Sequence, residues 1–177
     1  IGSIYYIFKN KEDIFQSLIL EMVQNAIAKV EEHCPGESPA YHFAASLEIE
    51  LKEMEVAPII RDVYKEGYES KLVFEHMVEQ FVFLAHHIFD NTPYRATEAE
   101  YYERMLLLKG AMHACISELY FETVHDHAKS RAALLQLGLR LFHVPEAEIA
   151  TIIERIAQKE ALWLEIANEL ATRPIGE

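Results

Sequence analysis

Apolar residues recur along most of this 177-residue chain at intervals of three and four positions, the spacing of residues on one face of an α-helix. Most of the glycines and prolines lie between these stretches, where helices are expected to stop. The pattern predicts an all-α fold of about seven helices. They cover residues 11–33, 38–54, 57–68, a following stretch that ends at 89, 98–123, 127–143 and 145–171.

The start of the first long helix is well specified. Asn10 can cap it by accepting a hydrogen bond from the first turn, and the acidic pair Glu12 and Asp13 complements the positive end of the helix dipole. The helix is therefore predicted to begin at Lys11, and Cys34-Pro35-Gly36 ends it. It links the first ten residues to everything downstream.

The stretch that ends at residue 89 is apolar on nearly all of its sides. Its apolar residues are Leu72, Val73, Phe74, Met77, Val78, Phe81, Val82, Phe83, Leu84, Ile88 and Phe89. A helix that is hydrophobic all round is typical of the interior of a protein. We therefore expect it to be buried on nearly every side and to form the centre of the domain.

The helix predicted over residues 98–123 carries small side chains on adjacent turns, at Gly110, Ala111, Ala114 and Cys115. Small side chains allow a second helix to approach closely. We expect this stretch to form a helix interface or the wall of a cavity.

The net charge of −13, from 29 acidic and 16 basic residues, should repel nucleic acid. The charge is unevenly distributed, because residues 1–11 hold two lysines and no acid, whereas residues 12–60 hold ten acids and two bases. An acidic body would restrict DNA contact to the first segment. The most apolar run, residues 81–85, is far shorter than the roughly 20 residues that span a bilayer, so we expect a cytoplasmic protein without membrane contact.

Patterns typical of catalysis or metal binding are weak. Consecutive glycines lie at least 28 residues apart, which excludes a glycine-rich phosphate loop. The nine histidines form no His-x-x-x-His pair, and Glu122 with His125 is the single Glu-x-x-His, whereas a di-metal bundle needs two. Cys34 and Cys115 indicate neither a disulfide framework nor a zinc site. The sequence therefore predicts no enzymatic activity, no cofactor and no metal.

Residues 3–9 divide into an apolar side and a side that is available to a partner. The apolar side holds Ile4, Ile7 and Phe8, and the other side holds Ser3, Tyr5, Tyr6 and Lys9. Contact with phosphates or bases is one hypothesis for the second set. In the alternative, the two tyrosines only pack against the next helix.

The order of residue types over residues 2–15 resembles the recognition helix and following turn of the tetracycline-repressor (TetR) family: small, apolar, Tyr, Tyr, any residue, Phe, any two residues, Lys, Glu, any residue, apolar. The resemblance implies that Ser3, Tyr5 and Tyr6 approach DNA from the recognition helix, and that Lys11 meets a phosphate. It also implies that most of the helix-turn-helix precedes residue 1. Ile7 departs from the family, where a histidine is frequent, and is assigned no DNA contact.

The resemblance further implies a homodimer and an effector pocket. In the TetR family two long helices late in the chain pair with those of a second subunit, a role that falls here to residues 98–123 and 127–143. Alternatively, both helices only complete the core of a monomer. The residues on helices expected to surround the pocket are Tyr64, Tyr68, Phe74, Met77, Phe81, Met112, His113 and Tyr120. Each could be simple core, but as a group they suggest a mostly apolar ligand.

The hypothesis from the sequence has two parts. Residues 1–10 are the end of a helix-turn-helix domain, and residues 11–177 form a helical ligand-binding and dimerisation domain. The protein would be a ligand-responsive transcriptional regulator, a repressor released from double-stranded operator DNA when a small, largely apolar effector favours one orientation of the helix beginning at Lys11. The alternative is a helical ligand- or metal-binding bundle with no DNA-binding role.

Overall fold

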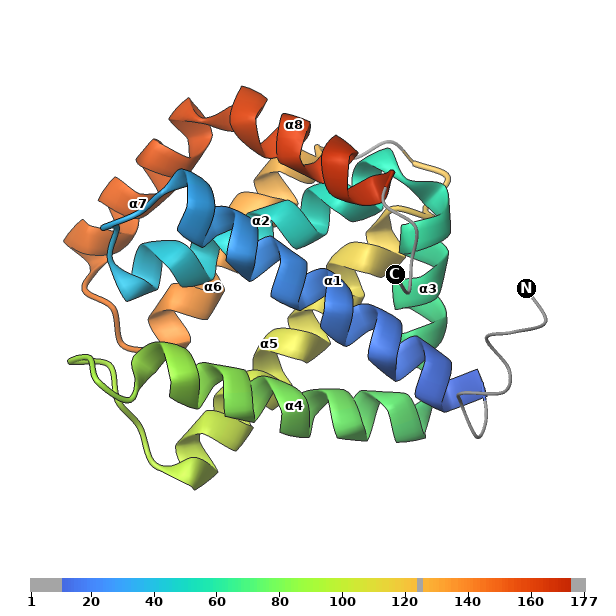
Figure 1. The fold of residues 1–177 in the computed structure, drawn as a ribbon, viewed down its shortest axis with the longest axis horizontal. Coiled ribbons are helices and arrows are strands. Elements are labelled where there is room, and N and C mark those ends of the chain that lie inside the picture. The colour runs from blue at the N-terminus through green and yellow to red at the C-terminus, as the bar shows by residue number, and fades with distance from the viewer. Residues whose placement is uncertain (1–10, 124–125, 173–177) are drawn as a thin grey trace.

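The computed structural model describes residues 11–123 and 126–172, and within these ranges the chain is all-helical, as predicted (Figure 1). The eight helices of the described part are α1 (Lys11–His33), α2 (Pro39–Val56), α3 (Pro58–Glu69), α4 (Lys71–Phe89), α5 (Glu98–Glu118), α6 (His127–Leu141), α7 (Glu146–Gln158) and α8 (Glu160–Ala171). The predicted end of α1 at His33 is confirmed. It is set by local residues, since Gly36, in the turn that follows, has a positive φ of 82°.

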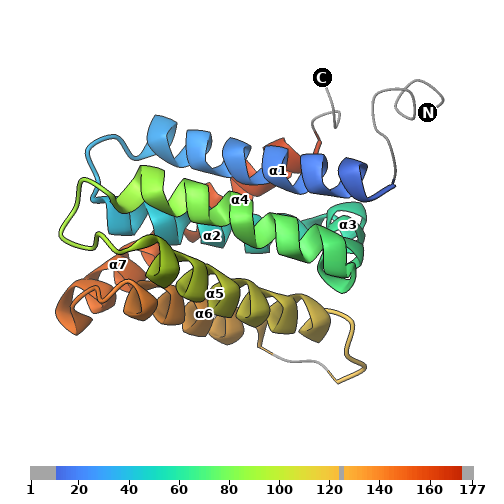
Figure 2. The same ribbon diagram turned by 90° about the horizontal axis from the view of Figure 1, so that it is seen from below.

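The helices are layered around α2. Figure 2 shows α1 along one side of the molecule and α5 and α6 along the other, with α2, α3 and α4 between them. Helix α2 packs against α1, α3, α4, α6, α7 and α8, so that every residue from Ala40 to Met54 except His42 is buried. The Ser38 hydroxyl caps this helix by accepting a hydrogen bond from the Tyr41 amide at 3.2 Å.

The expectation that residues 72–89 form the centre of the domain is wrong. One side of α4 faces solvent, where Phe83 is 71% exposed and Leu72 is 45% exposed. The centre is α2, although it carries Glu48, Glu50 and Lys52 among its buried residues. Those charges meet partners on other helices, which the local pattern cannot reveal.

The single helix predicted over residues 145–171 is two helices. The chain bends at Lys159, whose φ of −104° and ψ of 22° are not helical. Across the bend the Trp163 indole Nε1 donates a hydrogen bond to the Ile156 carbonyl at 2.8 Å, so the buried ring fixes the angle between α7 and α8. As a result α7 packs on α6 and α2, while α8 packs on α2 and α1.

Helix α5 ends at Glu118 rather than near residue 123. Its small residues divide into two pairs. Ala111 and Cys115 are partly buried and pack against the core, whereas Gly110 and Ala114 are exposed, and a Cβ built on Gly110 meets no atom of the described chain within 4 Å. Nearby apolar side chains are also exposed, including Leu107 on α5 at 53% and Leu137 on α6 at 39%. The side of the α5–α6 pair that carries these residues is therefore uncovered in the single chain.

None of the helices in the described ranges is long and apolar enough to cross a membrane.

Candidate functional site

A cleft of about 500 Å³ opens between α1, the start of α2 and the end of α4. Its volume lies in the range typical of small-molecule sites, ~300–1,000 Å³. The residues that line it are Gln24, Ile27, Ala28, Glu31, Glu37, Pro39, His42, Ser46, Leu84, His87 and Ile88. Most of the apolar lining comes from α1 and α4, which both pack on α2.

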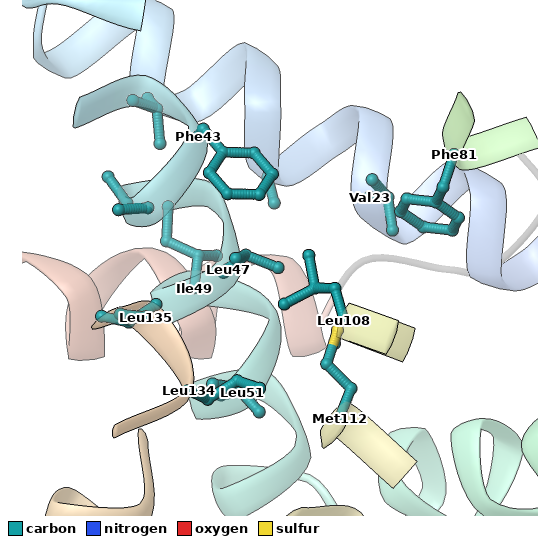
Figure 3. Close-up of a cluster of buried hydrophobic side chains, with 14 of the residues drawn as sticks. Val23, Phe43, Leu47, Ile49, Leu51, Phe81, Leu108, Met112, Leu134 and Leu135 are labelled. Atoms are coloured by element: carbon teal, nitrogen blue, oxygen red, sulfur yellow. The ribbon is translucent and has the colours of Figure 1, made fainter. Parts of the chain in front are cut away.

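A second, much smaller cavity of about 30 Å³ lies behind this cleft, between α1, α2, α4 and α5. Ile27, Ser46 and Ile88 line both spaces, so they form the wall between them. The other residues around the cavity are Val23, Phe43, Leu47, Glu50, Phe81, Met105, Leu108 and Lys109. Figure 3 shows Val23 beside Phe81, and Leu47 pointing toward Leu108.

The cavity wall holds one buried ion pair, which we call the cavity pair: Glu50 on α2 and Lys109 on α5. The Lys109 ammonium is fully buried and lies 3.9 Å from Glu50 Oε2, too far for a hydrogen bond. Among the described residues, its acceptor within hydrogen-bond distance is the Met112 thioether Sδ at 3.4 Å, and the Phe81 ring centroid lies 3.2 Å away. A thioether is a weak acceptor, so a group with three donor hydrogens is left poorly bonded.

Burial dominates the electrostatics of this pair. It lowers the pKa of Lys109 to about 8, against the opposing influence of Glu50, and it raises the pKa of Glu50. The Tyr64 hydroxyl donates a hydrogen bond to Glu50 Oε2 at 3.3 Å. With the ammonium and the carboxylate both ionised, the cavity pair carries no net charge.

Glu53 lies one turn further along α2 and is 1% exposed. Its Oε1 atom has no hydrogen-bond partner among the described residues. Burial, and secondarily the nearby Glu50 carboxylate, raise the pKa of Glu53 to about 8. The carboxyl is therefore mainly protonated at pH 7 and adds little charge to the cavity pair.

Five of the eight candidate ligand-binding residues lie together beside this pair. The Tyr68 ring contacts Tyr64, Phe74 and His113, with centroid separations of 6.3, 5.7 and 5.7 Å respectively. The Tyr68 hydroxyl donates to Met112 Sδ at 3.7 Å. Burial raises the pKa of Tyr64 and of Tyr68 well above its ordinary value, so both hydroxyls remain neutral donors.

The other three candidates are dispersed. Phe81 lines the small cavity, and Met77 is buried in the core. Of the eight candidates, the other seven line neither of the two spaces described above. Tyr120 is 40% exposed, and its hydroxyl donates to Asp62 at the surface, beside Arg61. The structure therefore gathers most of the aromatic set around the cavity pair and places Tyr120 outside it.

Glu50, Glu53 and Lys109 were not among the residues singled out from the sequence. A signal for Lys109 is present, because it is a lone charge between Leu106-Leu107-Leu108 and Gly110-Ala111-Met112. In α2, however, the charges lie on two sides of the helix, with positions 48, 52 and 55 on one side and positions 50 and 53 on another. The sequence alone does not show which of these sides is buried.

A second group of charges lies on α2, and we call it the α2–α6–α8 network: Glu48, Lys52 and Glu55 of α2, Arg131 of α6 and Glu160 of α8. Arg131 Nε donates to Glu48 at 3.2 Å, and its Nη1 donates to Glu55. Lys52 donates to Glu160 and lies 3.7 Å from Glu48. Here every charged group is close to an opposite charge, and the network joins three helices.

Of the candidate DNA-binding residues, Lys11 lies within the described residues, and Ser3, Tyr5 and Tyr6 lie outside them. The Lys11 side chain is 67% exposed and its Nζ is 2.5 Å from Glu66 Oε2 on α3. The first turn of α1 is thereby joined to α3, next to the segment that resembles a recognition helix.

In the described ranges, no group of three or more His, Cys, Asp or Glu side chains is arranged to hold a metal ion. Comparison of the chain with protein-family models, with curated proteins and with solved structures finds no match.

Proposed function

We propose that this protein is a ligand-responsive DNA-binding regulator of the TetR type, a repressor that a small, largely apolar effector releases from its operator. The observation that carries the proposal is the position of α1. This helix supplies Gln24, Ile27 and Ala28 to the wall of the cleft, and it begins at Lys11, directly after the segment that resembles a DNA reader.

Helix α1 is suited to transmit a change from the cleft. Its 23 residues are one uninterrupted helix about 34 Å long at 1.5 Å per residue. It also packs closely on α3, since a Cβ built on Gly67 lies only 2.5 Å from Ile19 Cδ1. A ligand that favoured one spacing of α1 from α4 would therefore tilt a rigid rod, and its first turn would move relative to DNA.

The uncovered side of α5 and α6 supports the dimer in this proposal. Tyr102, Leu106 and Leu107 are exposed on α5, and Leu137 is exposed on α6. Close approach of a second helix is possible at Gly110, where nothing of the described chain lies within 4 Å of a built Cβ. The same surface on two copies would form an isologous four-helix interface that sets the spacing of two readers.

The test is fluorescence anisotropy of the full-length protein with labelled DNA from upstream of its own gene, over a salt series. We expect binding that weakens as salt rises and falls at least about tenfold for the double change Tyr6→Ala, Lys11→Ala. Lys71→Ala is the matched control, because it removes an exposed lysine from the first turn of a different helix.

Absence of binding, or binding that the double change leaves intact, would remove the regulator from consideration. In that case a helical ligand-binding bundle with no DNA role would be the better description, because the cleft and the cavity pair do not depend on DNA.

A further inference from the structure

We infer that the effector is an uncharged, elongated molecule with an apolar tail and one carbonyl-bearing head group, and that the head group reaches the cavity pair while the tail lies in the cleft. The inference rests on the ligand-binding part of the proposed function and specifies the chemistry of its ligand.

The first step concerns hydrogen bonding at Lys109. A buried ammonium is normally surrounded by oxygen acceptors, because an unsatisfied charged donor is costly in the interior. The Lys109 Nζ atom instead has a thioether at 3.4 Å, a carboxylate oxygen at 3.9 Å and an aromatic face. A carbonyl oxygen entering the cavity would supply the missing strong acceptor.

The second step concerns charge. Glu50 and Lys109 compensate each other when both are ionised, and both are almost completely buried. A carboxylate head would bring a second negative charge next to Glu50, and an amine would bring a second positive charge next to Lys109. Either leaves an uncompensated charge in a region of low dielectric, so the neutral head group is favoured.

The third step concerns the path and the tail. The small cavity of about 30 Å³ can hold only a few atoms, but it shares Ile27, Ser46 and Ile88 with the cleft of about 500 Å³. A ligand that displaces the Ile27 and Ile88 side chains joins the two spaces. Ile27, Leu84 and Ile88 then contact its tail, and the tail lies against α1, the helix assigned the transmitting role.

The experiment compares three probes that share one tail and differ in head group: decanamide, decanoate and decylammonium. Binding to the full chain is measured by isothermal titration calorimetry. We expect decanamide to bind at least about tenfold more tightly than either charged probe, and we expect Lys109→Met to weaken its binding by about tenfold or more.

Two further variants make the result specific. Lys52→Met is the matched control, because Lys52 is also a buried lysine but belongs to the α2–α6–α8 network and lines neither the cleft nor the small cavity. The Lys52→Met variant should bind decanamide as tightly as the wild type. Ser46→Leu adds bulk at the wall between cleft and cavity and should abolish decanamide binding while leaving the cavity pair in place. Its result decides the question even if Lys109→Met does not fold.

A preference for decanoate or decylammonium would overturn the neutral head group. If the wild type bound none of the three probes, or if decanamide bound both Lys109→Met and Ser46→Leu as tightly as the wild type, the assignment of the ligand to the cleft and the cavity pair would be wrong. These failures are separable from failure of the regulator, which the DNA titration measures without any ligand.

Discussion

The two groups of charge on α2 differ in how completely they are bonded. In the α2–α6–α8 network, Arg131 donates to Glu48 and Glu55, and Lys52 donates to Glu160, so each charge meets an opposite one. In the cavity pair, the Lys109 ammonium is 3.9 Å from Glu50, and the neighbouring Glu53 has an unbonded oxygen. The two groups also differ in depth, because Glu50, Glu53 and Lys109 are almost completely buried, whereas the network reaches the surface at Glu160, whose side chain is 57% exposed.

The difference indicates two roles for buried charge in one helix. The network joins three helices, and its partners come from residues 83 and 108 positions away in the chain, so it specifies how the core closes. The cavity pair joins α2 to α5 at a place where packing is incomplete, next to a cavity and a cleft. A buried ammonium without a strong hydrogen-bond acceptor is expected where a ligand supplies that acceptor. We expect the two groups to respond differently to substitution.

The largest effect is expected from Arg131→Met. It leaves Glu48 and Glu55 without their main partner, and loss of one member of a buried ion pair costs about 3–5 kcal/mol. Urea denaturation followed by circular dichroism measures the change in unfolding free energy. Arg140→Met changes another arginine of α6 and breaks its exposed pair with Glu146 of α7, so it should leave the midpoint unchanged. Equal effects of the two changes would show that the network does not stabilise the core.

A slightly smaller effect is expected from Glu53, and it depends on pH. Its pKa is about 8 in the folded chain against 4.5 as the ordinary value, because burial disfavours the carboxylate. Between pH 4.5 and 8 the unfolded chain loses this proton while the folded chain keeps it, so stability falls as pH rises and levels off above pH 8. Glu53→Gln removes this loss, which is on the order of 4 kcal/mol between pH 5 and pH 8.5.

The measurement is the difference in unfolding free energy between Glu53→Gln and the wild type at pH 5 and at pH 8.5. This difference should grow in favour of the variant as pH rises, because other titrating groups are common to both proteins. A difference that is the same at both pH values would contradict a buried, protonated Glu53.

The cavity pair offers a sharper contrast with the network. Lys109→Met alone should cost about 2 kcal/mol, because it leaves Glu50 buried without its counter-charge. The double change Glu50→Gln, Lys109→Met should lie within about 1 kcal/mol of the wild type, since it removes both charges and keeps similar volumes. A double-mutant cycle with the two single variants measures this. If the double variant were as unstable as Arg131→Met, the cavity pair would stabilise the core as much as the α2–α6–α8 network does.

The same contrast explains how far the sequence could predict the molecule. The end of α1 was predictable because Pro35-Gly36 acts locally. The central position of α2 was not, because burial of Lys52 depends on Glu160, 108 residues away. The bend at Lys159 accompanies the burial of Trp163 and the packing of α8 on α2 and α1, and those helices lie far away in the sequence. The resemblance grouped Tyr64, Tyr68 and Met112 in one region, but it did not indicate the charges of Lys109 and Glu50 beside them.

The smallest effect on stability is expected at the exposed pair of Lys11 and Glu66, which completes the series from bonded and buried to solvent-exposed. Glu66→Gln should change the unfolding free energy by less than about 0.5 kcal/mol, because water screens a pair whose side chains are 67% and 50% exposed.

If Lys11 meets a phosphate, Glu66→Gln should bind DNA about two- to threefold more tightly than the wild type at low salt, because the Glu66 carboxylate no longer competes for the Lys11 ammonium. The gain in affinity should vanish at high salt. Glu69→Gln removes the same charge from α3 but from a pair with Lys65, so it separates competition for Lys11 from a general change in charge. Equal gains from the two variants would show that only the net charge matters, and that the Lys11–Glu66 contact has no part in DNA binding.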